Sequence, residues 1–256
     1  MNSTSNTPLS PVLCVEPHTL VVADVHLQLD HTHPINQHFL YFLAHQATQA
    51  EALYILGDLF ESWVGDDVSI ELYKSVIQAV KQLTQNGVHV YFQYGNRDFL
   101  MGDHFCQETG AAKLDAIHLA TLYGTRYIML HGDELCTDDI EYQRFKKWVR
   151  NPVIQFLFLR LSRTRRLRIA DTMRTRSKNE SATKQADIMD VNENAVESLL
   201  ESYPEIQHII HGHTHRPQLH TITMNKQIKQ RWVLGDWRPE SKIMVISKQG
   251  PALIDY

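Results

Sequence analysis

The stretch that decides the fold is Ala52-Leu53-Tyr54-Ile55-Leu56-Gly57-Asp58, in which five apolar residues lead directly into a glycine and an aspartate. A short, uninterrupted apolar run is typical of a buried strand. Gly57 permits a tight turn at the end of that strand. The run therefore predicts a strand in the interior of the protein whose last turn presents an acidic side chain.

The same kind of element recurs along the chain and alternates with amphipathic segments. Further strands are predicted at residues 19–23, 88–94, 126–130 and 208–210, and helices at 34–49 and 68–86. The C-terminal part differs, because residues 218–224, 230–234, 243–247 and 252–255 read as consecutive strands separated by turns. Strands that alternate with helices predict an α/β fold, in which helices pack on a sheet.

Polar side chains of the types that bind metals follow the predicted strands. The fragments are Asp24-Val25-His26, Gly57-Asp58, Gly95-Asn96-Arg97-Asp98, His131-Gly132-Asp133 and His211-Gly212-His213-Thr214-His215. Each fragment alone is compatible with an ordinary turn. Sites in α/β sheets assemble beyond the carboxyl ends of strands, so fragments far apart in sequence can meet there. The complete ordered set predicts one shared site.

The residue types indicate a two-metal centre. Carboxylate and amide oxygens together with imidazole nitrogens suit Mn, Fe or Zn, and the three cysteines form no C-x-x-C pair that would suggest a thiolate zinc site. Asp58 has two oxygens and can bridge two cations. Two metals about 3.5–4 Å apart can activate a water and clamp the attacking and leaving oxygens of a displacement.

This ordered set resembles the calcineurin-like metallophosphoesterases over residues 21–217. The resemblance implies a two-sheet αββα sandwich. It also implies that Asp24, His26 and His215 hold one metal, that Asn96, His131 and His213 hold the other, and that Asp58 bridges them. The resemblance assigns no ligand role to His211, and we expect it to be structural or to support a ligand.

Longer strings narrow the resemblance to the UDP-2,3-diacylglucosamine pyrophosphatases of Gram-negative lipid A synthesis. They are residues 52–61, 95–100, 131–139 and 188–192. The resemblance implies that water attacks the α-phosphorus, that UMP and 2,3-diacylglucosamine 1-phosphate (lipid X) are released, and that Mn²⁺ is the metal. It implies the catalytic residues Asp58, Asn96, Arg97 and His131. It implies substrate contacts at Asn96, Arg97, Asp139, Ser177, Ser181, Lys184 and His213.

Two positions depart from that family's pattern. Ser181 stands where an asparagine is expected, which puts its contact to the sugar in question. Asp236 precedes Trp237 where a small uncharged residue is usual, and the sequence offers no physical reason for this carboxylate.

The sequence divides into a core at 18–137 and 186–256, a helical insertion at 138–185 and a loosely ordered tail at 1–17. Residues 144–184 hold 13 of the 25 Lys and Arg but only 2 of the 29 Asp and Glu. Basic and apolar residues interleaved on short helices suit an anionic membrane surface or a lid over an acylated, charged substrate. The alternative is a helical hairpin whose aromatic residues pack on the core.

The composition limits the classes of function and the cellular location that we expect. The net charge of −4 and the pI of about 6.4 give no overall signature of nucleic-acid binding. No signal peptide or long apolar segment is evident, and we expect a cytoplasmic protein that associates peripherally with the inner membrane and has no obligate protein partner. The alternatives are a metallophosphoesterase acting on nucleotides or nucleic acid, and a binding scaffold that has lost its metals. The scaffold should lack ligands, whereas this chain has all seven.

Overall fold

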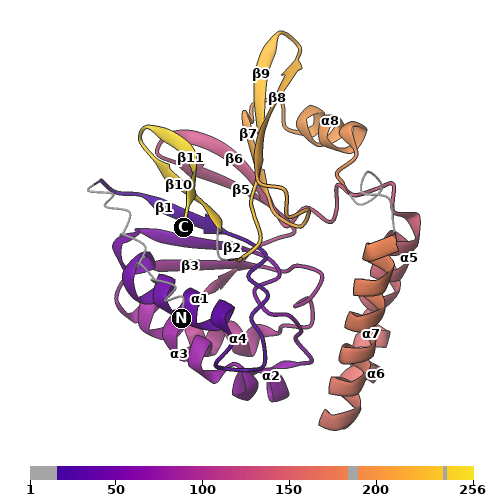
Figure 1. Cartoon of the computed structure of the whole chain (residues 1–256). Coiled ribbons are helices and arrows are strands. Elements are labelled where there is room, and N and C mark those ends of the chain that lie inside the picture. The colour runs from indigo at the N-terminus through magenta and orange to yellow at the C-terminus, as the bar shows by residue number, and fades with distance from the viewer. Residues whose placement is uncertain (1–15, 184–189, 239–240) are drawn as a thin grey trace, which may run out of the picture.

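The computed structural model describes residues 16–183, 190–238 and 241–256, without the side chains of 178–183. It contains two mixed sheets packed face to face (Figure 1). The first has the strand order β11-β10-β1-β2-β3-β4 and the second the order β5-β6-β7-β9-β8. Strands β1 to β4 run parallel to one another, as do β6, β7 and β9, so several strand ends point to the same edge.

The strands of the first sheet are β1 (Thr19–Val22), β2 (Ala52–Leu56), β3 (His89–Gln93), β4 (Ala112–Lys113), β10 (Lys242–Ser247) and β11 (Gly250–Asp255). Those of the second are β5 (Ile117–Leu122), β6 (Thr125–Leu130), β7 (His208–His211), β8 (Gln218–Met224) and β9 (Gln227–Val233). The predicted C-terminal strands are present. They divide between the two sheets, because the chain leaves the second after β9 and enters the first at β10.

Alternate residues of β2 face two different cores, which explains its continuous apolar sequence. Leu53 and Ile55 pack with the helices α1 (Pro34–His45), α3 (Lys74–Gln85) and α4 (Asp103–Thr109) on one face. Tyr54 and Leu56 join the core between the two sheets. Successive side chains of a strand point to opposite faces, so a strand in the middle of the sandwich is apolar throughout.

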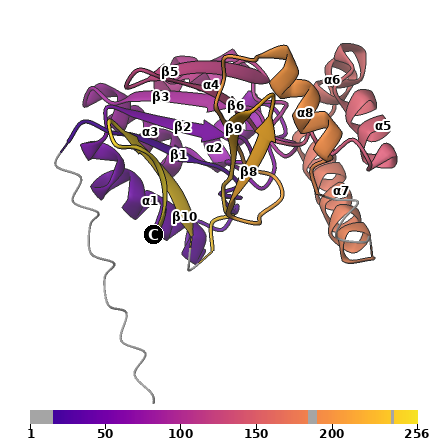
Figure 2. The same cartoon turned by 90° about the horizontal axis from the view of Figure 1, so that it is seen from above.

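A third core closes the outer face of the second sheet. There Ile128 and Ile209 pack against Leu200 of helix α8 (Glu193–Ser202). The layers are thus helices, sheet, sheet and helix, which confirms the predicted αββα sandwich (Figure 2).

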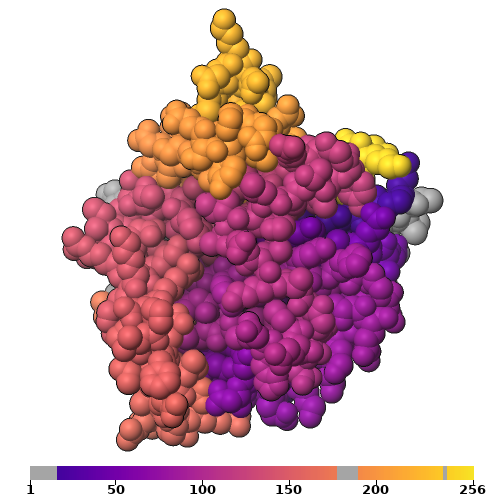
Figure 3. Space-filling model, turned by 180° about the vertical axis from the view of Figure 1, so that it is seen from behind, coloured from indigo at the N-terminus to yellow at the C-terminus, as the bar shows by residue number. Residues whose placement is uncertain are grey.

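Three helices come after β6 in the chain, before α8 and β7, and stand at one side of the sandwich: α5 (Ile140–Val149), α6 (Pro152–Leu159) and α7 (Arg163–Thr183) (Figures 1 and 3). No residue of α5 or α6 is buried. In contrast, Arg166 of α7 is only 3% exposed. Its guanidinium donates to the Val64 carbonyl and to both carboxylate oxygens of Asp67, and so anchors α7 to the body. No helix within the described ranges is long and apolar enough to cross a membrane.

Some predicted elements differ in detail. The helix predicted at 34–49 ends at His45 and is followed by the 3₁₀ turn η1 (Ala47–Gln49). The helix predicted at 68–86 is two, α2 (Asp66–Leu72) and α3, with non-helical backbone at Tyr73. The Tyr73 ring is buried against Phe60 and Trp63, and this packing at the junction overrides local helical preference.

Candidate metal centre and active site

The predicted ligands lie on loops that leave the carboxyl ends of β1, β2, β3, β6 and β7. Backbone hydrogen bonds join these loops: Asp24 N–H donates to Gly57 O at 3.1 Å, His26 N–H to Asp58 O at 2.9 Å, and Gly212 N–H to His131 O at 2.8 Å. The loops therefore form one connected surface beyond the sheet edges.

Several of these residues have a backbone conformation that L-residues seldom adopt. The φ angles of Asp24, His26, Asp58, His213 and His215 are 53°, 54°, 52°, 70° and 54°. Positive φ at non-glycine residues costs free energy and tends to occur at functional sites, where the surrounding structure enforces it. Glycines allow the loops to approach closely: a Cβ on Gly95 would lie 2.0 Å from Asp58 Oδ1.

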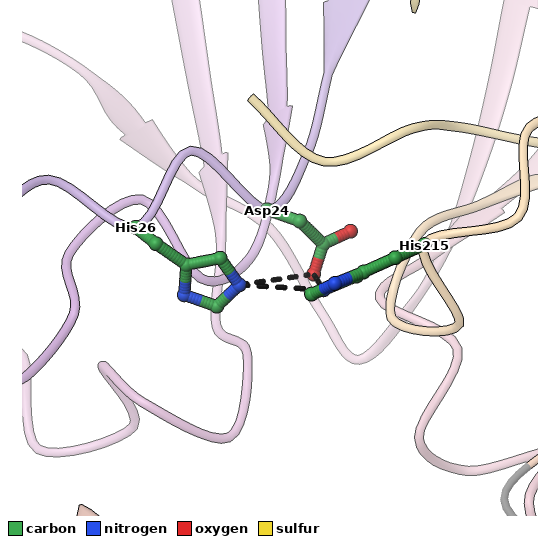
Figure 4. Close-up of side chains that lie close together, drawn as sticks. All are labelled: Asp24, His26 and His215. Atoms are coloured by element: carbon green, nitrogen blue, oxygen red, sulfur yellow. Dashed lines mark hydrogen bonds and ion pairs between the residues drawn. The ribbon is translucent and has the colours of Figure 1, made fainter. Parts of the chain in front are cut away.

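Asp24, His26 and His215 form a first cluster of ligand atoms (Figure 4). His215 Nε2 lies 3.3 Å from Asp24 Oδ1 and 3.3 Å from His26 Nε2, and His26 Nε2 lies 4.0 Å from Asp24 Oδ1. Asp24 Oδ2 accepts a hydrogen bond from His213 N–H, whereas the buried Oδ1 has no hydrogen-bond partner among the described residues. One carboxylate oxygen and two imidazole nitrogens thus converge, as a metal ion requires.

Asp24, Asp58 and His131 form a second cluster. His131 Nδ1 bonds to the Leu56 carbonyl at 2.9 Å, which leaves Nε2 to face Asp58 Oδ1 at 3.8 Å. Asp58 Oδ2 lies 4.0 Å from His26 Nε2 of the first cluster. The two oxygens of Asp58 therefore face histidines of different clusters, an arrangement suited to a bridging ligand. Asp24 also belongs to both clusters.

Asn96 and His213 lie at the edge of the second cluster. Asn96 Oδ1 is 3.0 Å from His131 Nε2. The His213 ring is beside that of His131, with centroids 5.0 Å apart, but its nitrogens join neither cluster.

The electrostatics of these residues fit cation binding. Burial lowers the pKa of His26 and of His213 to about 3, so both imidazoles are neutral at pH 7. Burial would also lower the pKa of His131, but the carboxylates of Asp58 and Asp24 outweigh it and raise this pKa to about 9. Burial raises the pKa of Asp58. The buried carboxylates and the neutral imidazoles of His26 and His213 suit divalent metals such as Mn, Fe or Zn. The raised pKa of His131 means that a cation bound at its Nε2 would displace a proton.

Two further aspartates hold the loops in place, and the sequence motifs gave no role to either. Asp98 accepts hydrogen bonds from Leu59 N–H and Gly95 N–H, both at 2.8 Å, and links the loops after β2 and β3. Burial raises the pKa of Asp98 to about 7. Asp133, also buried, accepts from the Tyr142 hydroxyl at 2.8 Å and pairs with Lys146 at 2.8 Å, which holds α5 against the loop that carries His131.

Arg97 lies between the metal cluster and α7. Its N–H donates to Asp58 Oδ1 at 2.8 Å, and its guanidinium Nη2 is 3.5 Å from Ser177 Oγ. No carboxylate in the described part of the chain, that of the neighbouring Asp98 included, pairs with this guanidinium, and its buried Nε has no hydrogen-bond partner there.

For the other predicted substrate-binding residues, the structure shows either contacts within the protein or no described side chain. Asp139 caps α5 by accepting from Tyr142 N–H. Ser177 meets Arg97, as noted above. Ser181 lies in α7 where side chains are not described, and Lys184 is outside the described residues.

His211 is structural. Its Nδ1 bonds to the Gly212 carbonyl at 2.8 Å, and its Nε2 accepts from Arg231 at 3.0 Å. Both ring nitrogens are thus engaged within the protein, and burial lowers the pKa of this histidine to about 4.

Residues 17–217 match the model of the calcineurin-like phosphoesterase family, to which this chain belongs. Among curated relatives, the UDP-2,3-diacylglucosamine hydrolases of Escherichia fergusonii and Escherichia coli are each 45% identical to it over 238 residues, 93% of this chain and 98% of theirs. That of Yersinia pseudotuberculosis is 44% identical with the same coverage.

Solved structures with a similar fold include an archaeal phosphodiesterase (12% identity, TM-score 0.46, covering 93% of this chain and 99% of the other). A dimetal phosphatase from Danio rerio is also similar (14% identity, TM-score 0.45, covering 96% and 100%). At these low scores, neither likeness bears on the function.

Proposed function

We propose that this protein hydrolyses the pyrophosphate bond of UDP-2,3-diacylglucosamine in lipid A biosynthesis, by attack of water on the α-phosphorus. The products would be UMP and 2,3-diacylglucosamine 1-phosphate. The observation that carries the proposal is the convergence of Asp24, Asp58 and the histidines at one edge of the sandwich, in a chain closely similar to the UDP-2,3-diacylglucosamine hydrolases.

In this proposal two divalent cations, Mn²⁺ by preference, bind with the ligands divided as the motifs imply. Asp24, His26 and His215 would hold one, Asn96, His131 and His213 the other, and Asp58 both. Such ions supply a water of lowered pKa and neutralise charge that develops on phosphate oxygens.

The side chains around the centre orient the substrate. The Arg97 guanidinium would bind a phosphate oxygen, since charge-assisted hydrogen bonds favour this pairing. The Leu56 carbonyl fixes the tautomer of His131, and Asp98 holds the loops of Asp58 and Asn96 at a constant separation. Asp139, Ser177, Ser181 and Lys184 would contact the nucleotide or the sugar phosphate.

Helices α5 to α7 would act as a lid that receives acyl chains. Large apolar side chains on these helices are exposed: Ile140, Phe145, Trp148, Val153, Phe156, Leu157, Leu159 and Met173. Their exposure argues against the alternative in which the aromatic residues are core. Exposed apolar surface commonly marks a lipid or protein contact. The adjacent basic residues would favour the anionic surface of the inner membrane on its cytoplasmic side.

Product analysis tests the reaction. The protein is incubated with UDP-2,3-diacylglucosamine and Mn²⁺ in H₂¹⁸O, and both products are examined by mass spectrometry. We expect UMP that carries ¹⁸O, together with unlabelled lipid phosphate. Release of UDP, or label in the lipid phosphate alone, would contradict attack at the α-phosphorus. Hydrolysis of nucleotides or nucleic acid without action on the lipid would favour the alternative substrate class.

A further inference from the structure

His215 of the first metal cluster is held between two carboxylates. Its Nε2 faces Asp24 Oδ1 at 3.3 Å, and its Nδ1, on the other side of the ring, lies 3.6 Å from Asp236 Oδ2. Asp236 is thus behind the histidine, opposite the nitrogen that would bind the metal.

The backbone around Asp236 is tied to the metal cluster. Trp237 N–H donates to the Asp24 carbonyl at 3.1 Å. The Trp237 indole is buried and packs edge-on against Phe39 and Phe42. Asp236 is therefore fixed relative to Asp24 by the adjacent residue, and its carboxylate, 17% exposed, faces His215 from a defined position.

The other histidine of this cluster has an equivalent neighbour. Glu61 Oε2 lies 3.5 Å from His26 Nδ1, again opposite the nitrogen that faces Asp24. Glu61 is buried, and its N–H donates to the Leu27 carbonyl in the segment just after His26. Both histidines of the first cluster thus have a carboxylate at Nδ1.

We propose that Asp236 is a positioning residue that orients His215 and strengthens binding of the first metal ion; Glu61 is placed in the same way behind His26. A carboxylate at the far nitrogen selects the tautomer with a proton on Nδ1 and makes Nε2 a better donor. The inference rests on the metal binding in the proposed function. It gives a role to Asp236, for which the sequence offered no physical reason.

Arg238 modulates this effect. Its guanidinium Nε pairs with the same oxygen, Asp236 Oδ2, that faces His215. Arg238 is 72% exposed, so water screens its charge. Removal of Arg238 leaves Asp236 free to pair with His215 alone.

Manganese affinity, measured on the full chain by equilibrium dialysis and by EPR of free Mn²⁺, tests the proposal without reference to activity. We expect Asp236→Ala to weaken one of the two sites about 10- to 100-fold and to leave the other within about twofold. Asp236→Asn keeps an oxygen acceptor and should therefore lose less manganese affinity than Asp236→Ala. Arg238→Ala should bind Mn²⁺ at least as tightly as the wild type. The matched control is Asp255→Ala, which removes an exposed aspartate paired with Lys242.

The outcomes separate the two levels of the proposal. A wild-type protein that binds no Mn²⁺ would contradict the proposed function itself. A wild type with two sites and an Asp236→Ala variant of unchanged affinity would overturn only the role of Asp236. Melting of the metal-free variants checks folding, and Asp236→Asn, which keeps the side-chain size, carries the test should the alanine variant fail to fold.

Discussion

At the scale of single residues, Asp58 is the side chain on which the two-metal arrangement depends. Its two oxygens face His131 and His26, at 3.8 and 4.0 Å, from different clusters. We predict that Asp58→Ala lowers kcat by about three orders of magnitude or more, because it removes the charge between two cations. Steady-state assays with saturating Mn²⁺ measure this. Retention of more than about a tenth of wild-type activity would refute the bridging role.

Arg97 should contribute to the binding and turnover of substrate and not to the binding of the metal ions. Its guanidinium is directed to Ser177 and pairs with no described carboxylate. Arg97→Ala should lower kcat/KM about 10- to 150-fold, the loss expected for charge-assisted hydrogen bonds worth about 1.5–3 kcal/mol. Its content of bound Mn²⁺ should equal that of the wild type. Arg97→Lys, which keeps the charge but not the planar fork, should recover part of the activity. Loss of metal from a folded variant would show that Arg97 supports Asp58.

His211 should contribute to stability in a pH-dependent way. Burial lowers the pKa of His211 from 6.5 to about 4, so the unfolded chain takes up its proton first. Its contribution is complete above pH 6.5 and is lost as the pH falls toward 4, by at most about 1.4 kcal/mol per pH unit.

We therefore expect the difference in unfolding free energy between wild type and His211→Gln to shrink between pH 7 and pH 5. Urea denaturation of the chelated proteins measures this difference and removes metal binding as a cause. A pH-independent difference would mean that His211 is not neutral in the folded protein.

At the scale of elements, the exposed aromatic residues of the helical insertion should matter only for lipid substrates. Burying each methylene is worth about 0.8 kcal/mol, so loss of the Trp148 and Phe156 side chains should weaken lipid binding at least about tenfold. A nitrophenyl phosphodiester makes no such contacts, and its hydrolysis should not change. The control, Ile228→Ala, removes an apolar side chain that is 65% exposed on β9. Equal losses on both substrates would show that the insertion only supports the metal centre.

The basic residues of α7 give a parallel test, but the structure restricts which of them can be used. Arg166 is an anchor to Val64 and Asp67, so its reversal would detach the helix. Arg163, Arg165 and Arg168 are exposed. Changing these three to Glu should reduce action on substrate in anionic vesicles but not in neutral detergent, and high salt should reproduce the loss by screening.

At the scale of the whole molecule, metal binding should stabilise the fold. The candidate ligands lie on loops from both sheets, so an ion that binds them only in the folded chain would link the two halves of the sandwich. At a concentration of 100 times Kd, such an ion adds about 2.7 kcal/mol, or about 5–11 °C in Tm for a chain of this size. Calorimetry with Mn²⁺ and with a chelator measures the shift. Asp58→Ala should show a smaller shift, and an unchanged wild-type Tm would contradict metal binding.

Much of the site could be read from local sequence. A glycine beside an aspartate or histidine at a strand end is a short-range feature, and the order of the five fragments needs no tertiary information. Strand β2 could also be predicted from local sequence, because its continuous apolar run indicates burial on both faces of the sheet. The half-exposed strand β5 and the short helix α4 were not predicted, because their apolar residues form no regular pattern over so short a length.

Other features were decided only by tertiary contacts. The helix predicted at 68–86 is interrupted at Tyr73 because the ring of that residue packs on Phe60 and Trp63, in the loop that precedes α2. His211 and His213 are neighbours in one motif, yet Arg231 of β9 donates to His211, while His213 lies beside His131 of the loop after β6. Arg166 is one of several arginines in a basic helix, and it becomes an anchor only through its contacts with Val64 and Asp67.

The sequence by itself thus determined the α/β class and, through its resemblance to a known family, the two-sheet sandwich. It also determined which loops carry the candidate ligands and the chemistry of those side chains, because each fragment consists of residues adjacent in the chain. Tertiary structure alone decided what lies behind each ligand: Asp236 behind His215, Glu61 behind His26, and the Leu56 carbonyl behind His131. The physical reason is that a hydrogen bond or ion pair depends on a few tenths of an ångström between groups from different strands. Only the packing of the two sheets fixes those distances.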